Sequence, residues 1–295
     1  MKPWTAGLDH GLTTVDIYSK QSIGMAVVIP VIYYGLIFIY KQLGWWEGQT
    51  TKYGTPIRNM IAYEFAFGVP CCWFSYCGIS LLLGRKGHED LYVEPLLSDW
   101  YYGQSDYIVS NLLWPMFVYQ AWNTIHSVFL IKDLCRAEMY GHHLVTCLVQ
   151  YLGLAGFLNY HAYFFIGLVE ISNVFLTIVD IPRFAPDMPA NWPITHKVCQ
   201  VGFILSFIIL RLILWPIISA PVIWDLVIML RDSTCHSEVV VCTFMFCTIA
   251  LTYLQFKWGV KIVQMGWAEA KKLFASDTGA APIKEQKGEE TDKCK

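Results

Sequence analysis

The decisive stretch of the chain reads EMYGHHLVT at 138–146 and EISN at 170–173, each within an apolar run. Both runs are long enough to cross a bilayer, yet each carries ionisable side chains that hydrocarbon does not solvate. Such groups usually face the interior of a helix bundle and mark a site, because exposing them to lipid is costly. The two runs therefore predict a membrane fold and also the place where function resides.

The composition of the 295-residue chain agrees with a membrane protein. Hydrophobic residues make up 55% and charged residues 15%, whereas a soluble domain usually carries about a quarter charged residues. The formal net charge of -2 gives no support for a nucleic-acid partner, and none is expected. Most of the ten cysteines lie in apolar runs without a CxxC pair, so we expect free thiols and no structural disulfide.

Seven apolar runs reach the length of about 20 residues that a transmembrane helix requires. They are approximately 23–40, 59–83, 107–131, 139–157, 161–180, 197–219 and 238–263. The predicted fold class is therefore all-α, a polytopic membrane helix bundle of about seven transmembrane helices. Residues 222–230 form a shorter apolar piece, which we expect to be re-entrant or interfacial.

Changes of composition divide the chain into three parts. Residues 1–56 form an N-terminal segment with the first transmembrane helix, 57–265 form the main domain, and 266–295 form a tail. The tail is rich in Lys, Glu, Gly and Ala, which predicts disorder. Lys and Arg are more frequent in alternate loops and in the tail, so the C-terminus is expected in the cytosol and the N-terminus outside.

The short connection at 158–160 predicts that 139–157 and 161–180 pair as a tight antiparallel hairpin whose polar residues share one chamber. His142 or His143 could act there as a base or nucleophile-like centre that Glu170 tunes, since histidine is the usual proton shuttle. Further polar residues at helical spacing are predicted to bind the ligand. They are Asn123, His126, Thr146, Asn173, Thr177, Arg211 and Gln255.

The alternative is that these polar groups only hold helices together through interhelical hydrogen bonds. We prefer that interpretation for Gln120, Ser127, Thr248 and Thr252. For the two histidines with Glu170 we prefer function, while Arg211 could serve as a counter-ion for Glu170 or for a lipid headgroup. Adjacent histidines point about 100° apart on a helix, so they cannot share one ion, and no metal is expected.

The motifs at 142–146 (HHLVT), 170–176 (EISNVFL), 211–216 (RLILWP) and 254–258 (LQFKW) resemble those of the TLC domain. That family contains the translocating-chain-associating membrane proteins, the ceramide synthases and the neuronal-ceroid cargo receptor. The resemblance covers roughly 57–265. It implies a lipid-facing cavity in the endoplasmic reticulum or a related membrane.

The chain departs from the ceramide synthases, which carry a His-Asp and a second Asp where this chain has Val169, Glu170 and Asn173. The resemblance therefore implies lipid homeostasis through binding or sensing a membrane lipid, with such lipids as partners. One alternative is a ceramide-synthase-like N-acyltransferase, with acyl-CoA as co-substrate and no resident cofactor. Another is a cargo receptor or chaperone for membrane proteins. Whether the chain forms a homodimer stays open.

Overall fold

The computed structural model describes residues 20–84, 106–134, 137–154, 158, 161–187, 191–235 and 237–277. Within these ranges the secondary structure is helical, apart from one isolated antiparallel bridge between Thr50 and Pro56. The predicted all-α class is confirmed. The N-terminal residues, the connection at 159–160 and the tail from 278 onward lie outside the described residues.

The helical segments follow one another closely along the chain. The first half contains α3 (Lys20–Gln42), α4 (Ile57–Leu82), α6 (Asp106–Ile108), η2 (Val109–Leu113), α7 (Trp114–Ile125), η3 (His126–Leu130) and η4 (Lys132–Leu134). The second half contains α8 (Ala137–Gly153), η6 (Tyr163–Leu168), α9 (Glu170–Asp180), η7 (Ile181–Arg183), α11 (Pro193–Ser206), η8 (Phe207–Leu214), α12 (Trp215–Arg231) and α13 (Glu238–Asp277). Segments η2, η3, η6 and η8 are π-helical, and η4 and η7 are 3-10 turns.

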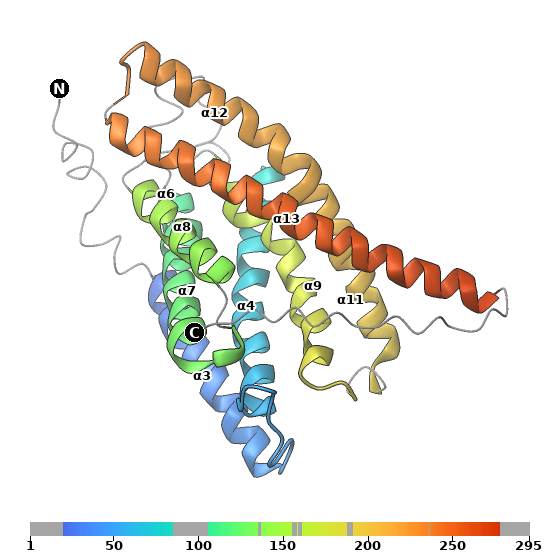
Figure 1. Cartoon of the computed structure of the whole chain (residues 1–295). Helices are drawn as coiled ribbons and strands as arrows, with labels where there is room; N and C mark the ends of the chain where they lie inside the picture. The colour runs from blue at the N-terminus through green and yellow to red at the C-terminus, as the bar shows by residue number, and fades with distance from the viewer. Residues whose placement is uncertain are drawn as a thin grey trace.

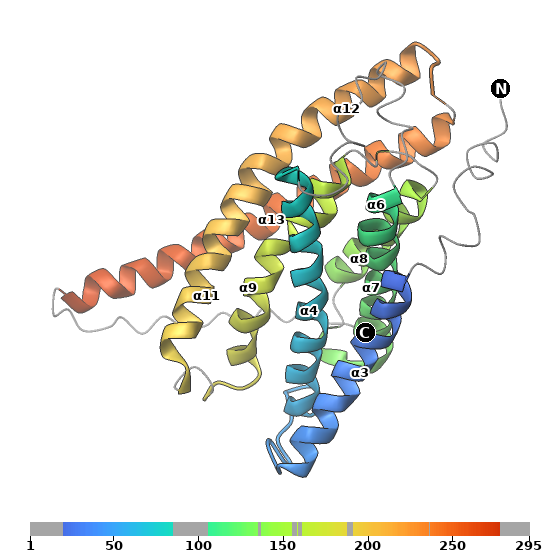
Figure 2. The same cartoon turned by 180° about the vertical axis from the view of Figure 1, so that it is seen from behind.

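The helices pack on one another in a closed ring. Helix α4 packs on α3, α3 on α7, α7 on α8, and α8 on α13. Helix α13 then packs on η8 and α12, while α11 returns through α9 to α4. Figures 1 and 2 show α12 and α13 running side by side at one end of the molecule and α13 extending beyond the other helices. The ring leaves an interior that several helices can line.

Five helical stretches are long and apolar enough to cross a membrane: Lys20–Gln42, Ile57–Leu82, Tyr163–Arg183, Pro193–Arg231 and Glu238–Ala268. The two remaining predicted runs are also helical, over 106–130 and in α8, so the prediction of about seven is consistent with the fold. The piece at 222–230 differs from expectation, because it continues the preceding helix without a break. Helix α13 likewise extends to Asp277, past the predicted end of the main domain.

Wide π-helical turns precede two of the three Trp-Pro pairs of the described residues, whereas the third, Trp192-Pro193, begins α11. Segment η2 ends directly before Trp114-Pro115, and η8 ends directly before Trp215-Pro216. Proline lacks the N–H that would bond to the preceding turn, and its ring crowds that turn, so a widened turn relieves the conflict. Because η8 contains Arg211, this local adjustment helps set the direction in which the guanidinium points.

Helix α4 and segment η6 cross at two glycines. A Cβ built on Gly78 would lie 2.8 Å from the backbone of Gly167, so the crossing has no room for a side chain. This approach holds η6 and α9 against α4, whereas α8 packs on α7 and α13. The predicted tight hairpin between α8 and α9 is therefore wrong. The two helices face each other across a space, and that space supports the predicted shared chamber.

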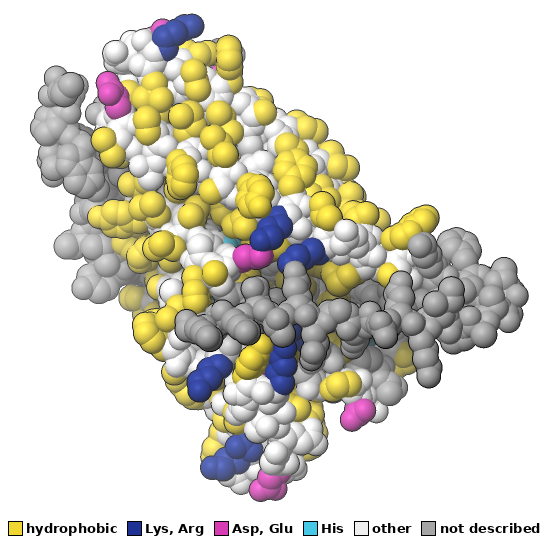
Figure 3. Space-filling model, viewed as in Figure 1, with side chains coloured by type: hydrophobic (Ala, Val, Ile, Leu, Met, Phe, Trp, Pro, Cys, Tyr) yellow, Lys and Arg dark blue, Asp and Glu magenta, His cyan; other side chains and the backbone are white. Residues whose placement is uncertain are grey.

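The outer surface is largely apolar. Figure 3 shows hydrophobic side chains covering the face over α12 and the adjoining part of α13, as expected for a surface in lipid. Among them are Ile217, Trp224, Val227, Val239, Phe246 and Ile249. The eight cysteines of the described residues are all free, in agreement with the prediction of no structural disulfide; Cys135 and Cys294 lie outside these residues.

Candidate functional site

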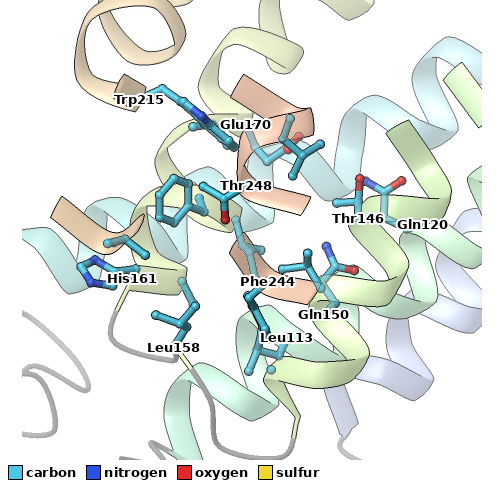
Figure 4. Close-up of a pocket in the computed structure, with 18 of the residues that line it drawn as sticks. Leu113, Gln120, Thr146, Gln150, Leu158, His161, Glu170, Trp215, Phe244 and Thr248 are labelled. Atoms are coloured by element: carbon cyan, nitrogen blue, oxygen red, sulfur yellow. The ribbon is translucent and has the colours of Figure 1, made fainter. Parts of the chain in front are cut away.

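A pocket occupies the interior of the ring between α7, α8, η6, η8 and α13 (Figure 4). Its volume is about 900 Å³, including a mouth that opens to the surroundings. Much of its wall is apolar, formed by Leu113, Val149, Phe165, Ile166, Val222 and Phe244. The polar part of the wall comprises Gln120, His142, Thr146, Gln150, His161, Glu170, Arg211, Thr248 and Gln255.

Helix α8 lines the pocket with a polar stripe. His142, Thr146 and Gln150 are spaced by four residues and so lie on one face of the helix. The Thr146 hydroxyl donates to the backbone oxygen of His142, which ties these two positions together. The ring of His142 packs edge-to-face against Trp258 of α13, with centroids 5.2 Å apart. Its Nδ1 atom is buried and has no hydrogen-bond partner among the residues that the structure describes.

Arg211 is the buried cation of the pocket and is only 5% exposed. Its Nε donates to the hydroxyl oxygen of Ser172 over 2.8 Å, and its Nη2 donates to the carbonyl oxygen of Val169 over 3.0 Å. Its Nη1 donates to Oε1 of Gln255 over 3.3 Å. A guanidinium has five N–H donors, so these three bonds to neutral oxygens leave two more. Arg211 thereby joins η8 to α9 and α13.

Glu170 begins α9 directly after the wide turn η6 and lines the pocket at 7% exposure. Its Oε2 accepts a hydrogen bond of 2.7 Å from Nδ2 of Asn173. The ion pairs within 4 Å among the described residues include neither Glu170 nor Arg211. The two opposite charges therefore share the pocket without direct contact.

An ion pair between Glu138 and Lys257 joins α8 to α13. It lies one turn from His142 on α8 and next to Trp258 on α13, so it fixes the two helices where the imidazole meets the indole. Both side chains are about one-third exposed, at 32% and 36%, which places the pair near the surface. We infer that it holds this end of the pocket closed against α13.

The structure brings together half of the predicted site residues. His142, Thr146, Glu170, Arg211 and Gln255 line the pocket, and the remaining five are not part of its wall. The five are His143, Asn123, His126, Asn173 and Thr177. His142 and Glu170 line the same pocket, but no hydrogen bond joins them in the described part of the chain.

The residues outside the wall have neighbours within the bundle. His143 Nδ1 lies 3.5 Å from the Ser127 hydroxyl. Oδ1 of Asn123 accepts a 2.5 Å hydrogen bond from the Tyr63 hydroxyl. His126 is fully buried. These contacts link α8 to η3 and α4 to α7, so they pack helices together.

Asn173 and Thr177 of α9 also have neighbours within the bundle. Asn173 donates to Glu170, and its backbone oxygen accepts a 3.1 Å hydrogen bond from the Thr177 hydroxyl. The Thr177 side chain also fills the space above Gly68 of α4. Asn173 therefore supports the pocket by orienting the Glu170 carboxylate, and Thr177 packs α9 on α4.

Several residues of the wall were not predicted. Gln120 and Thr248 had been assigned to helix packing, and Gln150 and His161 had not been singled out. The spacing of Gln150 eight residues after His142 is the sequence signal that would have found it, because it continues the polar stripe of α8. Oε1 of Gln120 and Oε1 of Gln150 are both buried, and neither has a hydrogen-bond partner within the described ranges.

No group of three or more His, Cys, Asp and Glu side chains gathers in the described ranges in a way that could hold a metal ion. The polar wall instead combines one guanidinium, one carboxylate, two histidines, hydroxyls and carboxamides. Its chemistry is that of hydrogen bonding and charge recognition beside an apolar surface. Together, the apolar helices and this interior pocket define a multi-pass membrane protein with a polar site inside its helix bundle.

The family model of the TLC domain, described as TRAM_LAG1_CLN8, matches residues 18–264. The chain belongs to the TLC-domain family, which confirms the resemblance seen in its motifs. The match also includes α3, the first described helix. No match to this chain was found among the curated proteins or the solved structures.

Proposed function

We propose that the protein binds a membrane lipid in the pocket and serves lipid homeostasis by sensing or holding that lipid. The observation that carries this proposal is the combination of an apolar wall with Arg211, Glu170 and His142 in one partly open cavity. An acyl chain fits the apolar wall, and the charged and polar residues fit a head group.

The geometry around His142 favours binding over acyl transfer. A histidine that acts as a general base is usually oriented by a second group bonded to its other ring nitrogen. Nδ1 of His142 has no such partner, and Glu170 bonds instead to Asn173. The N-acyltransferase, with acyl-CoA as co-substrate, is therefore the second candidate, and the cargo receptor or chaperone is the third.

The first prediction concerns His142→Ala. Because the imidazole lines the pocket and its Nδ1 bonds to no protein atom, the change should reduce copurified lipid about tenfold and leave the melting temperature nearly unchanged. Mass spectrometry of lipid extracted from the purified protein measures the first quantity. His196→Ala on α11, outside the pocket wall, is the matched control and should retain wild-type lipid.

A His142→Ala protein that melts at a lower temperature but keeps its full lipid content would contradict the proposal. That result would assign the histidine to helix packing alone. If neither the wild-type protein nor the control contains lipid in excess of the detergent-exchanged background, lipid binding itself is wrong.

The second prediction concerns topology. The connections between α3 and α4 and between α9 and α11 lie at the same end of the bundle (Figures 1 and 2). Basic residues flank both connections: Lys41, Lys52, Arg58, Arg183 and Lys197. Basic loops face the cytosol, so we propose that this end is cytosolic, in the endoplasmic reticulum or a related membrane. A tag after Lys295 should be digested by protease added to sealed microsomes. If protease instead digests a tag placed before Met1 and spares the tag after Lys295, the orientation is opposite to the predicted one.

A further inference from the structure

Three residues of the pocket wall each carry a buried polar atom without a hydrogen-bond partner among the described residues. Nδ1 of His142, Oε1 of Gln120 and Oε1 of Gln150 are buried and make no hydrogen bond to the described part of the chain, and all three residues line the pocket. Buried polar atoms in native proteins are nearly always paired, so a cluster of exceptions at one cavity points to a missing partner. The two carboxamide oxygens can only accept, so the partner must carry O–H or N–H groups.

The charges of the wall restrict the partner further. With histidines neutral, the charged residues of the wall are Arg211 and Glu170, which sum to zero. Three of the five N–H groups of Arg211 already bond to protein oxygens. A phosphate would bring negative charge to a site whose single guanidinium is balanced and largely occupied. Burying an uncompensated charge in a membrane protein is costly, so the wall fits an uncharged group better.

The polar groups are also spread along the pocket. His142 and Gln150 are eight residues apart on α8, which corresponds to about 12 Å along the helix axis. In Figure 4, Gln150, Leu113 and Phe244 lie at one side of the space, while Glu170 and Trp215 lie at the other. The ligand must therefore offer hydrogen-bond donors near Gln150 as well as near Glu170, whereas Arg211 can only donate.

We propose that the pocket takes an uncharged lipid whose polar part carries O–H or N–H donors, and that Gln120 and Gln150 select it by accepting from those donors. This inference rests on the proposed function, because it names the class of lipid for the same pocket. It excludes phosphate-bearing lipids as the preferred ligand. It also assigns ligand binding to Gln120 and Gln150, whereas carboxamides in helix bundles often only pack helices together.

Three probes with the same oleoyl chain test this proposal on the purified full-length protein. Monooleoylglycerol has two hydroxyl donors, methyl oleate has none, and oleoyl lysophosphatidic acid carries a phosphate. Dissociation constants are measured by native mass spectrometry in one detergent. We expect monooleoylglycerol to bind about tenfold more tightly than either of the other two, as one or two good hydrogen bonds would allow.

The variant Gln150→Leu keeps most of the side-chain volume and removes the acceptor. It should weaken monooleoylglycerol about tenfold and leave the affinity for methyl oleate unchanged. Gln264→Leu removes the same group from an exposed position of α13 and should change neither affinity. If Gln150 has a purely structural role, Gln150→Leu would instead weaken the affinities for monooleoylglycerol and methyl oleate by the same factor.

Equal binding of monooleoylglycerol and methyl oleate, or the same affinities in wild type and Gln150→Leu, would overturn the inference while lipid binding stands. Tighter binding of lysophosphatidic acid would overturn it in favour of an anionic ligand. If none of the three probes binds at concentrations that leave the detergent-solubilised protein folded, the inference falls together with the proposed function.

Discussion

Arg211→Met is expected to destabilise the bundle by about 3 kcal/mol or more and to abolish lipid retention. The guanidinium joins η8 to Ser172 and Val169 beside the pocket and to Gln255 of α13. Methionine fills similar volume but leaves these three oxygens without their donor inside the bundle. It also leaves Glu170 as the only charge of the pocket wall. Denaturant titration in mixed micelles measures the loss of unfolding free energy.

Arg231→Met is the control for this change, because Arg231 is exposed at the end of α12 and, within the described residues, donates to the neighbouring Asp232. Its replacement should not change stability. Adding Glu170→Gln to Arg211→Met should recover part of the loss, since the pocket is then neutral again. An Arg211→Met protein as stable as wild type would show that the guanidinium network does not hold these helices together.

Gly78→Ala is expected to be one of the most damaging single-methyl changes among the described glycines. The added Cβ would lie 2.8 Å from backbone atoms of Gly167 and Leu168, which cannot rotate away as a side chain could. Separating α4 from η6 would also displace Glu170, which follows η6 in the chain. Overpacking usually costs 1–3 kcal/mol, and a backbone clash should place this change at about 3 kcal/mol.

Gly35→Ala supplies the matched comparison, because a Cβ on Gly35 of α3 meets no atom within 4 Å. The gain in helix propensity from glycine to alanine is the same at both positions, so only the atoms around the added Cβ differ. Gly35→Ala should be neutral or stabilising by up to about 1 kcal/mol. If the two variants unfold at the same denaturant concentration, the α4–η6 crossing is looser than the structure indicates.

The sequence predicted the helices well because their signal is local. A run of about 20 apolar residues has few alternatives to a helix in a bilayer, since backbone polar groups must bond within the segment. The same argument identified Glu170 and Arg211, whose charges require an interior position. The sequence did not predict where a helix ends within a long apolar run. For this reason 222–230 was separated from the helix that it continues.

The neighbours of the site could not be predicted because they depend on helix rotation. His142 and His143 differ in direction by about 100°, and only packing decides which one faces the pocket. Trp258 contacts the first ring, and Ser127 lies beside the second. The prediction of a tight hairpin was wrong for a similar reason. Chain proximity suggested that α8 and α9 touch, whereas the glycine crossing at Gly78 holds the second helix against α4.

The unbroken helix Pro193–Arg231 has a consequence for the surrounding bilayer. Its 39 residues extend about 58 Å, roughly twice the ~30 Å thickness of a hydrocarbon core. Its far half remains apolar on the outside, with Trp224 65% exposed, so water is an unfavourable surrounding for it. The helix must therefore tilt steeply or draw lipid up around itself. Either response couples the protein to membrane thickness, which would favour its residence in some membranes over others.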